Sequence, residues 1–204
     1  MNKAIPKQVR ELINELSRLP TIGQKSAMRL AFAILTDERL DADKLASSIV
    51  EAVNNSKLCD SCFSISSDDL CEICQDETRD NGSICVVEKP QDVIALEKSG
   101  IFSGTYHVLH GLWSPVRKVS PEETKIPELV KRIKDSNGEI KEVILATSTS
   151  VEGDATAMYI GTSLKEYGVK ISRISQGIPK GGDLEYIDEV TLSYALNGRV
   201  AIGE

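Results

Sequence analysis

CDSCFSISSDDLCEIC, residues 59–74, is the stretch around which this 204-residue chain is organised. It holds two Cys-x-x-Cys pairs, and such pairs can supply four thiolates to one tetrahedral Zn²⁺ at about 2.3 Å. Two disulfides are the alternative. We do not expect them, because no secretory signal precedes the segment and cytosolic thiols stay reduced. The predicted zinc ligands are Cys59, Cys62, Cys71 and Cys74.

The predicted zinc is structural, because protein ligands fill all four positions and leave none for water. The loop that the zinc would close, residues 59–74, carries no Lys or Arg and four acids, which are Asp60, Asp68, Asp69 and Glu72. Such a loop is a poor match for a phosphate backbone. We therefore expect the zinc segment to brace the basic N-terminal part against the acidic remainder, so that chelation harms folding or assembly first.

Composition is that of an ordinary globular protein, with 41% hydrophobic and 27% charged residues. The length fits one large or two small domains. No apolar run is long enough to span a membrane, and we expect a cytoplasmic protein. Nine aromatic residues offer no evident surface for stacking single-stranded bases.

Charge is unevenly distributed along the chain. Residues 1–36 carry six Lys or Arg and two Glu, which gives +4, and the chain total of −7 therefore leaves −11 for the remainder. A basic module on an acidic body is expected when one part meets phosphate and another meets a basic partner or a metal.

Two amphipathic helices flank a tight turn near the N-terminus. Apolar residues recur at helical spacing over residues 7–18, Pro20 ends that helix, and a second helix follows Gly23. The backbone N–H groups at the start of the second helix favour a phosphate, and Lys25 and Arg29 lie on one face beside it. This arrangement resembles a helix-hairpin-helix, a DNA-backbone binder. An ordinary two-helix corner with solvated charges is the alternative.

Beyond the cysteines, apolar strands alternate with helices. Strands are predicted at residues 84–88, 106–109, 143–146 and 169–171. This order implies an α/β fold in which a parallel sheet is covered by helices on both faces. A last helix is predicted at 187–196, with Val190 and Tyr194 facing inward. The predicted parts are a helical module at 1–56, a zinc ribbon at 57–77, a sheet domain at 78–175, and a C-terminal loop, helix and tail at 176–204.

Acidic residues follow two of the strands, where ligands gather in such sheets. Glu88 ends one strand, and Glu152 and Asp154 lie in a Ser-rich loop after another. The pattern resembles the Toprim domain of topoisomerases, primases and related nucleases, in which an Asp-x-Asp pair binds Mg²⁺. Here Ser148 and Ser150 occupy those positions, and neutral hydroxyls cannot replace two carboxylates. We expect the three acids to form a partner-binding surface, with a solvated loop end as the alternative.

The order of these parts resembles the bacterial RecR family of recombination mediators over nearly the whole chain. The supporting stretches are LPTIGQKSA at 19–27, the cysteine quartet, YHVLHG at 106–111, VEG at 151–153 and GGDLEY at 181–186. The resemblance implies a non-enzymatic DNA clamp, a dimer or tetrameric ring, that helps RecO and RecF to load RecA on single-stranded DNA. It implies DNA contacts at Gly23, Lys25 and Arg29, and RecO contacts at Glu88 and Glu152.

Two stretches depart from the family's commoner form. Thr21 stands where glycine is usual, and Arg117-Lys118 stand in a stretch that is commonly Gly-Ile-Gly-Pro. We expect the two cations to be solvated, with a wider DNA-facing surface as the alternative. A Mg²⁺-dependent Toprim nuclease or primase is the rival function, and a metal-braced scaffold with no nucleic-acid role is a third.

Overall fold

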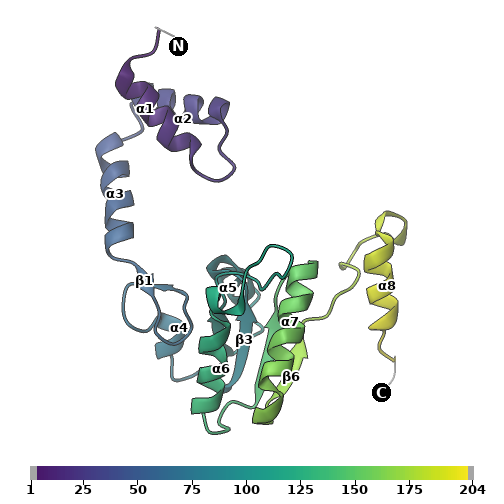
Figure 1. Ribbon diagram of the computed structural model, residues 1–204. Coiled ribbons are helices and arrows are strands. Elements are labelled where there is room, and N and C mark those ends of the chain that lie inside the picture. Colours follow the sequence, from purple (N-terminus) through teal and green to yellow (C-terminus); the bar gives the residue numbers. More distant parts are fainter. Residues whose placement is uncertain (1–3, 202–204) are drawn as a thin grey trace. The chain divides into compact units, whose positions relative to one another are not determined.

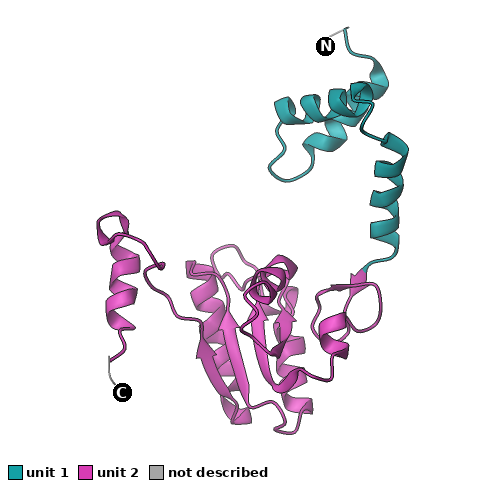
Figure 2. Cartoon of the chain, turned by 180° about the vertical axis from the view of Figure 1, so that it is seen from behind, with its two compact units in different colours: residues 1–56 teal, residues 57–204 magenta. Residues whose placement is uncertain are grey.

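The computed structural model describes residues 4–201 of the chain. It divides into two compact units, Met1–Ser56 and Lys57–Glu204 (Figure 2). None of the helices that residues 4–201 form is both long and apolar enough to cross a membrane.

The first unit is made of three helices, α1 (Lys7–Ser17), α2 (Gln24–Thr36) and α3 (Ala42–Asn54) (Figure 1). Helices α1 and α2 pack together through Ile13, Ala27 and Ala31, whose side chains are at most 4% exposed. Alanine lets the two helices approach closely. Asp41 caps α3, and its side chain accepts a hydrogen bond from the N–H of Lys44.

Much of the apolar surface of this unit stays uncovered. Helix α3 buries no side chain at all in the described chain, and its Ile49, Val50 and Val53 are each more than half exposed. Phe32 and Leu35 on α2 are 45% and 54% exposed. The first unit therefore leaves apolar side chains in contact with solvent on both helices.

The second unit begins with the cysteine-rich segment, which we call the metal module (residues 57–78). Strands β1 (Lys57–Leu58) and β2 (Ile65–Ser66) pair antiparallel and are followed by the short helix α4 (Glu72–Gln75). The first Cys-x-x-Cys pair lies in the connection between the strands, and the second pair spans the start of α4.

A four-stranded sheet forms the centre of the second unit. Its strands β3 (Asp80–Val87), β4 (Gly104–Val108), β5 (Glu142–Ala146) and β6 (Lys170–Arg173) are ordered β4-β3-β5-β6. Each neighbouring pair is parallel, which confirms the predicted fold class. The strand order also makes β4 an edge strand.

Helices cover both faces of the sheet, and the alternation of side chains along β3 separates the two cores. Ile84 and Val86 pack with α6 (Ile126–Asp135) and α7 (Val151–Leu164) on one face. Cys85 and Val87 pack with α5 (Pro90–Glu97) and with part of the metal module on the other face. Figure 1 shows α6 and α7 on the opposite side of the strands from α5.

Shorter elements complete the unit. Single 3₁₀ turns occur at Pro121–Glu123, Lys165–Tyr167 and Leu184–Tyr186. The C-terminal helix α8 (Glu189–Asn197) forms as predicted, and Val190 and Tyr194 face the sheet: they line a small pocket with Thr149 and Ile174. The Tyr194 hydroxyl donates to the carboxylate of Asp154 at 3.4 Å. The two side chains nevertheless remain 64% and 43% exposed, so α8 buries none of its residues.

Candidate functional site

The four predicted ligands come together. The Sγ atoms of Cys59, Cys62, Cys71 and Cys74 all lie within 4.8 Å of one another, and those of Cys62 and Cys71 are 3.5 Å apart. A tetrahedral thiolate site with bonds of about 2.3 Å requires sulfurs roughly 3.8 Å apart. All four cysteines are free, and three of them are buried.

The chemistry of the cluster suits a cation. Backbone N–H groups of Ser64 and Cys71 point at the sulfurs of Cys62 and Cys59, at 3.4 and 3.3 Å. A hydrogen bond between the side chains of Cys62 and Cys74 raises the pKa of Cys62 and lowers the pKa of Cys74 to about 5. Several thiolates buried together repel one another unless a cation lies between them. The cluster therefore fits a thiophilic metal ion with a filled ligand shell.

Three consecutive carbonyl groups attach the first Cys-x-x-Cys pair to the sheet. The N–H of Val108 donates to the carbonyl of Cys62 at 2.8 Å. A guanidinium N–H of Arg132 donates to Ser61 at 3.3 Å, and Nε2 of His110 lies 2.6 Å from the carbonyl of Phe63. The metal module thus covers part of the otherwise unpaired edge of β4.

Arg132 is the central residue of this attachment. From α6 it also donates to the carbonyl of Tyr106 at 2.8 Å and to Oγ1 of Thr105 at 3.1 Å. Burial lowers the pKa of its guanidinium. This role of Arg132 was not foreseen from the sequence, because 71 residues separate it from Ser61 and no local pattern marks the contact.

Phe63 and His107 extend the contact into the core. Phe63 adopts a left-handed φ of 61°, and its ring packs edge-on against the fully buried imidazole of His107 at 5.3 Å. Nε2 of His107 lies 2.8 Å from the carbonyl of Lys125. Burial lowers the pKa of His107 to about 4, so its imidazole is neutral at pH 7.

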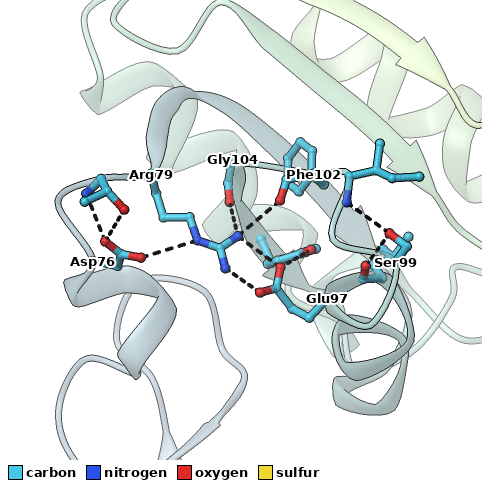
Figure 3. Close-up of polar contacts among 10 residues, drawn as sticks. Asp76, Arg79, Glu97, Ser99, Phe102 and Gly104 are labelled. Atoms are coloured by element: carbon cyan, nitrogen blue, oxygen red, sulfur yellow. Dashed lines mark hydrogen bonds and ion pairs between the residues drawn. The ribbon is translucent and has the colours of Figure 1, made fainter.

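A second network ties the far end of the metal module to the sheet (Figure 3). The guanidinium of Arg79 pairs with the carboxylate of Glu97 on α5 and lies 3.8 Å from that of Asp76. It also donates to the carbonyls of Phe102 and Gly104, each at 3.3 Å. The hydrogen bond from Arg79 lowers the pKa of Glu97. These contacts hold α5 and the metal module together.

In the first unit, the predicted DNA-contacting residues lie at the start of α2. Gly23 is the N-cap and offers no side-chain cap. Within residues 4–201, the N–H groups of Gln24, Lys25 and Ser26 donate no hydrogen bond. In the same range, neither Lys25 nor Arg29 lies within 4 Å of a carboxylate oxygen, unlike other cations of this unit such as Lys7, Arg18 and Arg39.

Thr21, in the turn before α2, has a left-handed φ of 68°. A β-branched side chain is strained there, whereas glycine adopts this conformation freely.

The three acids of the predicted partner surface are each paired with a cation of their own unit. Glu88 lies 3.0 Å from Lys89. Asp154 lies 2.6 Å from Arg173. Glu152 lies 3.4 Å from Arg117, so this cation, which we expected to be solvated only, has a partner although its side chain is 75% exposed.

The serines after β5 serve the backbone. The hydroxyls of Ser148 and Ser150 lie 2.9 Å apart, and Ser150 caps α7 by accepting from the N–H of Gly153 at 3.1 Å. Gly153 packs so closely that an added Cβ would lie 1.9 Å from the carbonyl oxygen of Ser148. Within residues 4–201, the cysteine quartet is the one group of three or more His, Cys, Asp or Glu side chains placed to share an ion.

Comparisons with known proteins match most of the chain. The family described as RecR, helix-hairpin-helix matches residues 9–53, the Toprim domain family matches residues 82–175, and the family described as RecR, C-terminal matches residues 177–200. The recombination protein RecR of Deinococcus radiodurans is 50% identical over 199 residues, which are 98% of this chain and 89% of that protein.

Proposed function

The chain belongs to the RecR family of recombination proteins, and from this premise we propose that it acts in DNA repair and recombination by binding the DNA backbone through its first unit. The start of α2 is the observation that carries the proposal. In the part of the chain that the structure describes, the first N–H groups of α2 donate no hydrogen bond, and Lys25 and Arg29, one helical turn apart, have no carboxylate partner. Phosphate is the ligand that such a helix end favours. Gly23, Lys25 and Arg29 are the proposed contacts.

Affinity for DNA should come mainly from phosphate neutralisation and depend little on base sequence. We expect Lys25→Ala combined with Arg29→Ala to lower affinity for a duplex about tenfold or more at low salt, and to reduce the salt slope by about 0.9 for each phosphate that is no longer neutralised. Fluorescence anisotropy with a labelled oligonucleotide across a salt series measures both quantities.

The matched control is Lys7→Ala combined with Arg18→Ala. It removes the same charge from the same unit, but both cations already pair with glutamates, Glu11 and Glu15. If the two double variants reduce affinity equally, general charge rather than the turn at Gly23 binds DNA, and the assignment fails.

We assign Zn²⁺ to the cysteine quartet, in a structural role. The close approach of the four Sγ atoms, all within 4.8 Å of one another, and the all-sulfur ligand set suit zinc, which would contribute folding free energy and no reaction step. Reduced thiols are consistent with a cytoplasmic location, which we also propose. Metal analysis of the purified protein should give about one zinc per chain.

We propose that the strand-end acids contact RecO-like and RecF-like partners that help to load RecA on single-stranded DNA. Since Glu88, Glu152 and Asp154 each already pair with a cation, a basic partner would exchange one ion pair for another, which favours reversible binding. Glu152→Gln should weaken binding of a purified RecO-like protein and leave DNA affinity unchanged.

Glu142→Gln is the control for this surface, because Glu142 pairs with Lys170 at the opposite end of β5. Equal binding by the wild type and the Glu152 variant in calorimetry would remove Glu152 from the partner surface.

We further propose that the chain forms a homo-oligomer, a dimer or a tetrameric ring. The uncovered apolar faces of α3 and α8 support this, since self-association would remove them from water. An oligomer also repeats the DNA-binding turn and so gains avidity. Ile49→Asp should lower the mass measured in solution by light scattering, whereas Glu51→Gln on the same helix should not.

We propose no enzymatic activity. At the strand ends the serines stand in place of a carboxylate pair, and the three acids are engaged in separate ion pairs. A Mg²⁺-dependent cleavage or primer synthesis that disappears in Glu88→Ala would establish the rival Toprim nuclease or primase.

A further inference from the structure

A groove of about 630 Å³ runs between the metal module and α5, and all of its lining residues belong to the second unit. Its walls are β2 and α4 on one side and α5 on the other. Ile73 and Val93 form its floor, and Val93 is only 4% exposed. Ile65 and Ile94, at its rims, are 60% and 56% exposed. Apolar side chains therefore line a concave surface that remains open.

The charge around this groove is predominantly negative. Residues 58–78 carry no Lys or Arg and six acids, which are Asp60, Asp68, Asp69, Glu72, Asp76 and Glu77. Asp68 and Glu72 line the groove, and Lys98 is the one cation among its described lining residues. Among residues 4–201, neither Asp68 nor Glu72 has a Lys or Arg nitrogen within 4 Å. Their charges are thus available to a ligand.

The groove is preformed. Arg79 binds Glu97 of the α5 wall while it lies beside Asp76 of the metal module, so the two walls are tied together at one end (Figure 3). The Tyr106 hydroxyl donates to the same Glu97 carboxylate at 2.6 Å and fixes it further. A ligand therefore has little ordering cost to overcome on this side of the contact.

We propose that this groove docks a short amphipathic segment of a partner protein, with apolar side chains on one face and Lys or Arg on the other. The apolar side would lie over Ile73 and Val93, and the cations would meet Asp68 and Glu72. The acidic walls disfavour nucleic acid and anionic lipid, and they also disfavour an acidic helix. Charge complementarity therefore selects the occupant, and this surface is separate from the proposed DNA contacts.

The probe is a fluorescein-labelled peptide of about 15 residues with Leu at positions i, i+3, i+4 and i+7 and Lys elsewhere. Binding to the zinc-loaded full chain is measured by anisotropy, beside a second peptide in which Glu replaces Lys. We expect the Lys peptide to bind at least about tenfold tighter than the Glu peptide.

Two variants locate the binding. Ile94→Asp should weaken the Lys peptide about tenfold, because it places a charge against the apolar face. Its control is Met158→Asp, an exposed apolar residue of α7 on the other face of the sheet. Asp68→Asn with Glu72→Gln should weaken binding about threefold and flatten its salt dependence. The control is Asp135→Asn with Glu139→Gln, two exposed acids at the end of α6 and in the turn that follows it.

The proposal is overturned by any of three results. The first is no saturable binding of the Lys peptide below about 1 mM. The second is equal weakening by groove and control variants, which would indicate general attraction to an acidic protein. The third is a lower mass of the Ile94→Asp chain in solution, which would make the groove a contact between copies of this chain. DNA affinity unchanged in Ile94→Asp keeps this test distinct from that of the DNA-binding turn.

Discussion

The helical unit and the sheet unit hold themselves together in different ways. Across residues 4–56, the buried side chains are Ile13, Ala27 and Ala31, and one whole helix buries none. The sheet unit has a core on each face, and its metal module is attached at both ends by buried or half-buried arginines. The sheet and its metal module thus bury a core of their own, whereas the helical unit, like α8 at the end of the chain, leaves apolar side chains exposed.

Removing one ligand of the metal should have the largest effect, and it should affect the sheet unit and not the helical unit. Cys62→Ala leaves three sulfurs and an incomplete ligand shell, so we expect loss of the metal and a melting temperature lower by about 10 °C or more. Hydrogen exchange should rise over residues 57–78 and β4 while α1 and α2 keep their protection. Cys85→Ala is the control, because Cys85 is also buried but lies outside the cysteine quartet. This substitution should lower the free energy of unfolding by only about 1 kcal/mol. Equal effects of the two variants would contradict a structural metal.

The start of α7 tests how tightly the sheet unit is packed. Gly153→Ala would force a Cβ against the Ser148 carbonyl, and we expect a loss of about 3 kcal/mol in the free energy of unfolding. Gly161→Ala, in the same helix with open space around it, should instead stabilise by about 0.5–1 kcal/mol. Urea unfolding of both variants measures the difference, and a loss in both would show that α7 tolerates no added methyl group.

Arg132 tests the attachment of the metal module. Arg132→Met removes three hydrogen bonds from one guanidinium and leaves the carbonyls of Ser61 and Tyr106 without these donors. We therefore expect the free energy of unfolding to fall by about 2 kcal/mol. The module should also release its metal faster to a chelator. Lys131→Met, at the exposed neighbouring position, should change neither quantity. Unchanged metal release in the Arg132 variant would mean that the backbone bond from Val108 is sufficient.

The smallest effect is expected in the helical unit. Thr21→Gly removes the strain of a β-branched residue in the left-handed region, but glycine also gives the unfolded chain more conformational entropy. As the net effect, we expect the free energy of unfolding to rise by about 0.5 kcal/mol. The control is Thr36→Gly at the last residue of α2, which should lower the free energy of unfolding by a few tenths of a kcal/mol. Hydrogen exchange of α1 and α2 resolves the change, and a loss of protection in Thr21→Gly would show that the threonine side chain stabilises the turn.

Local pattern was sufficient to predict many parts of the fold. Spacing alone identified the cysteine quartet, and the alternation of strands and helices was also foreseen. Each depends on residues close together in the chain. For Val190 and Tyr194 the same reasoning gave the side that faces the sheet but not their exposure, because helical periodicity shows which face of α8 is apolar and not how closely it packs.

The ion pairs of the strand-end acids also differ in whether the sequence could predict them. The pair of Glu88 with its neighbour Lys89 could have been foreseen from the sequence. The pairs of Glu152 with Arg117 and of Asp154 with Arg173 could not, since they join residues brought together only when the loops close.

In residues 59–74, the four metal ligands and their acidic surroundings follow from the amino-acid order alone, because two short spacings bring each cysteine pair to one ion. The folded chain was needed to show that Arg132, Val108 and His110 hold three successive carbonyls of that segment. It was also needed to show that Arg79 closes a groove beside the segment. Contacts between residues tens of positions apart depend on how the sheet and its helices pack, and no local sequence pattern identifies them.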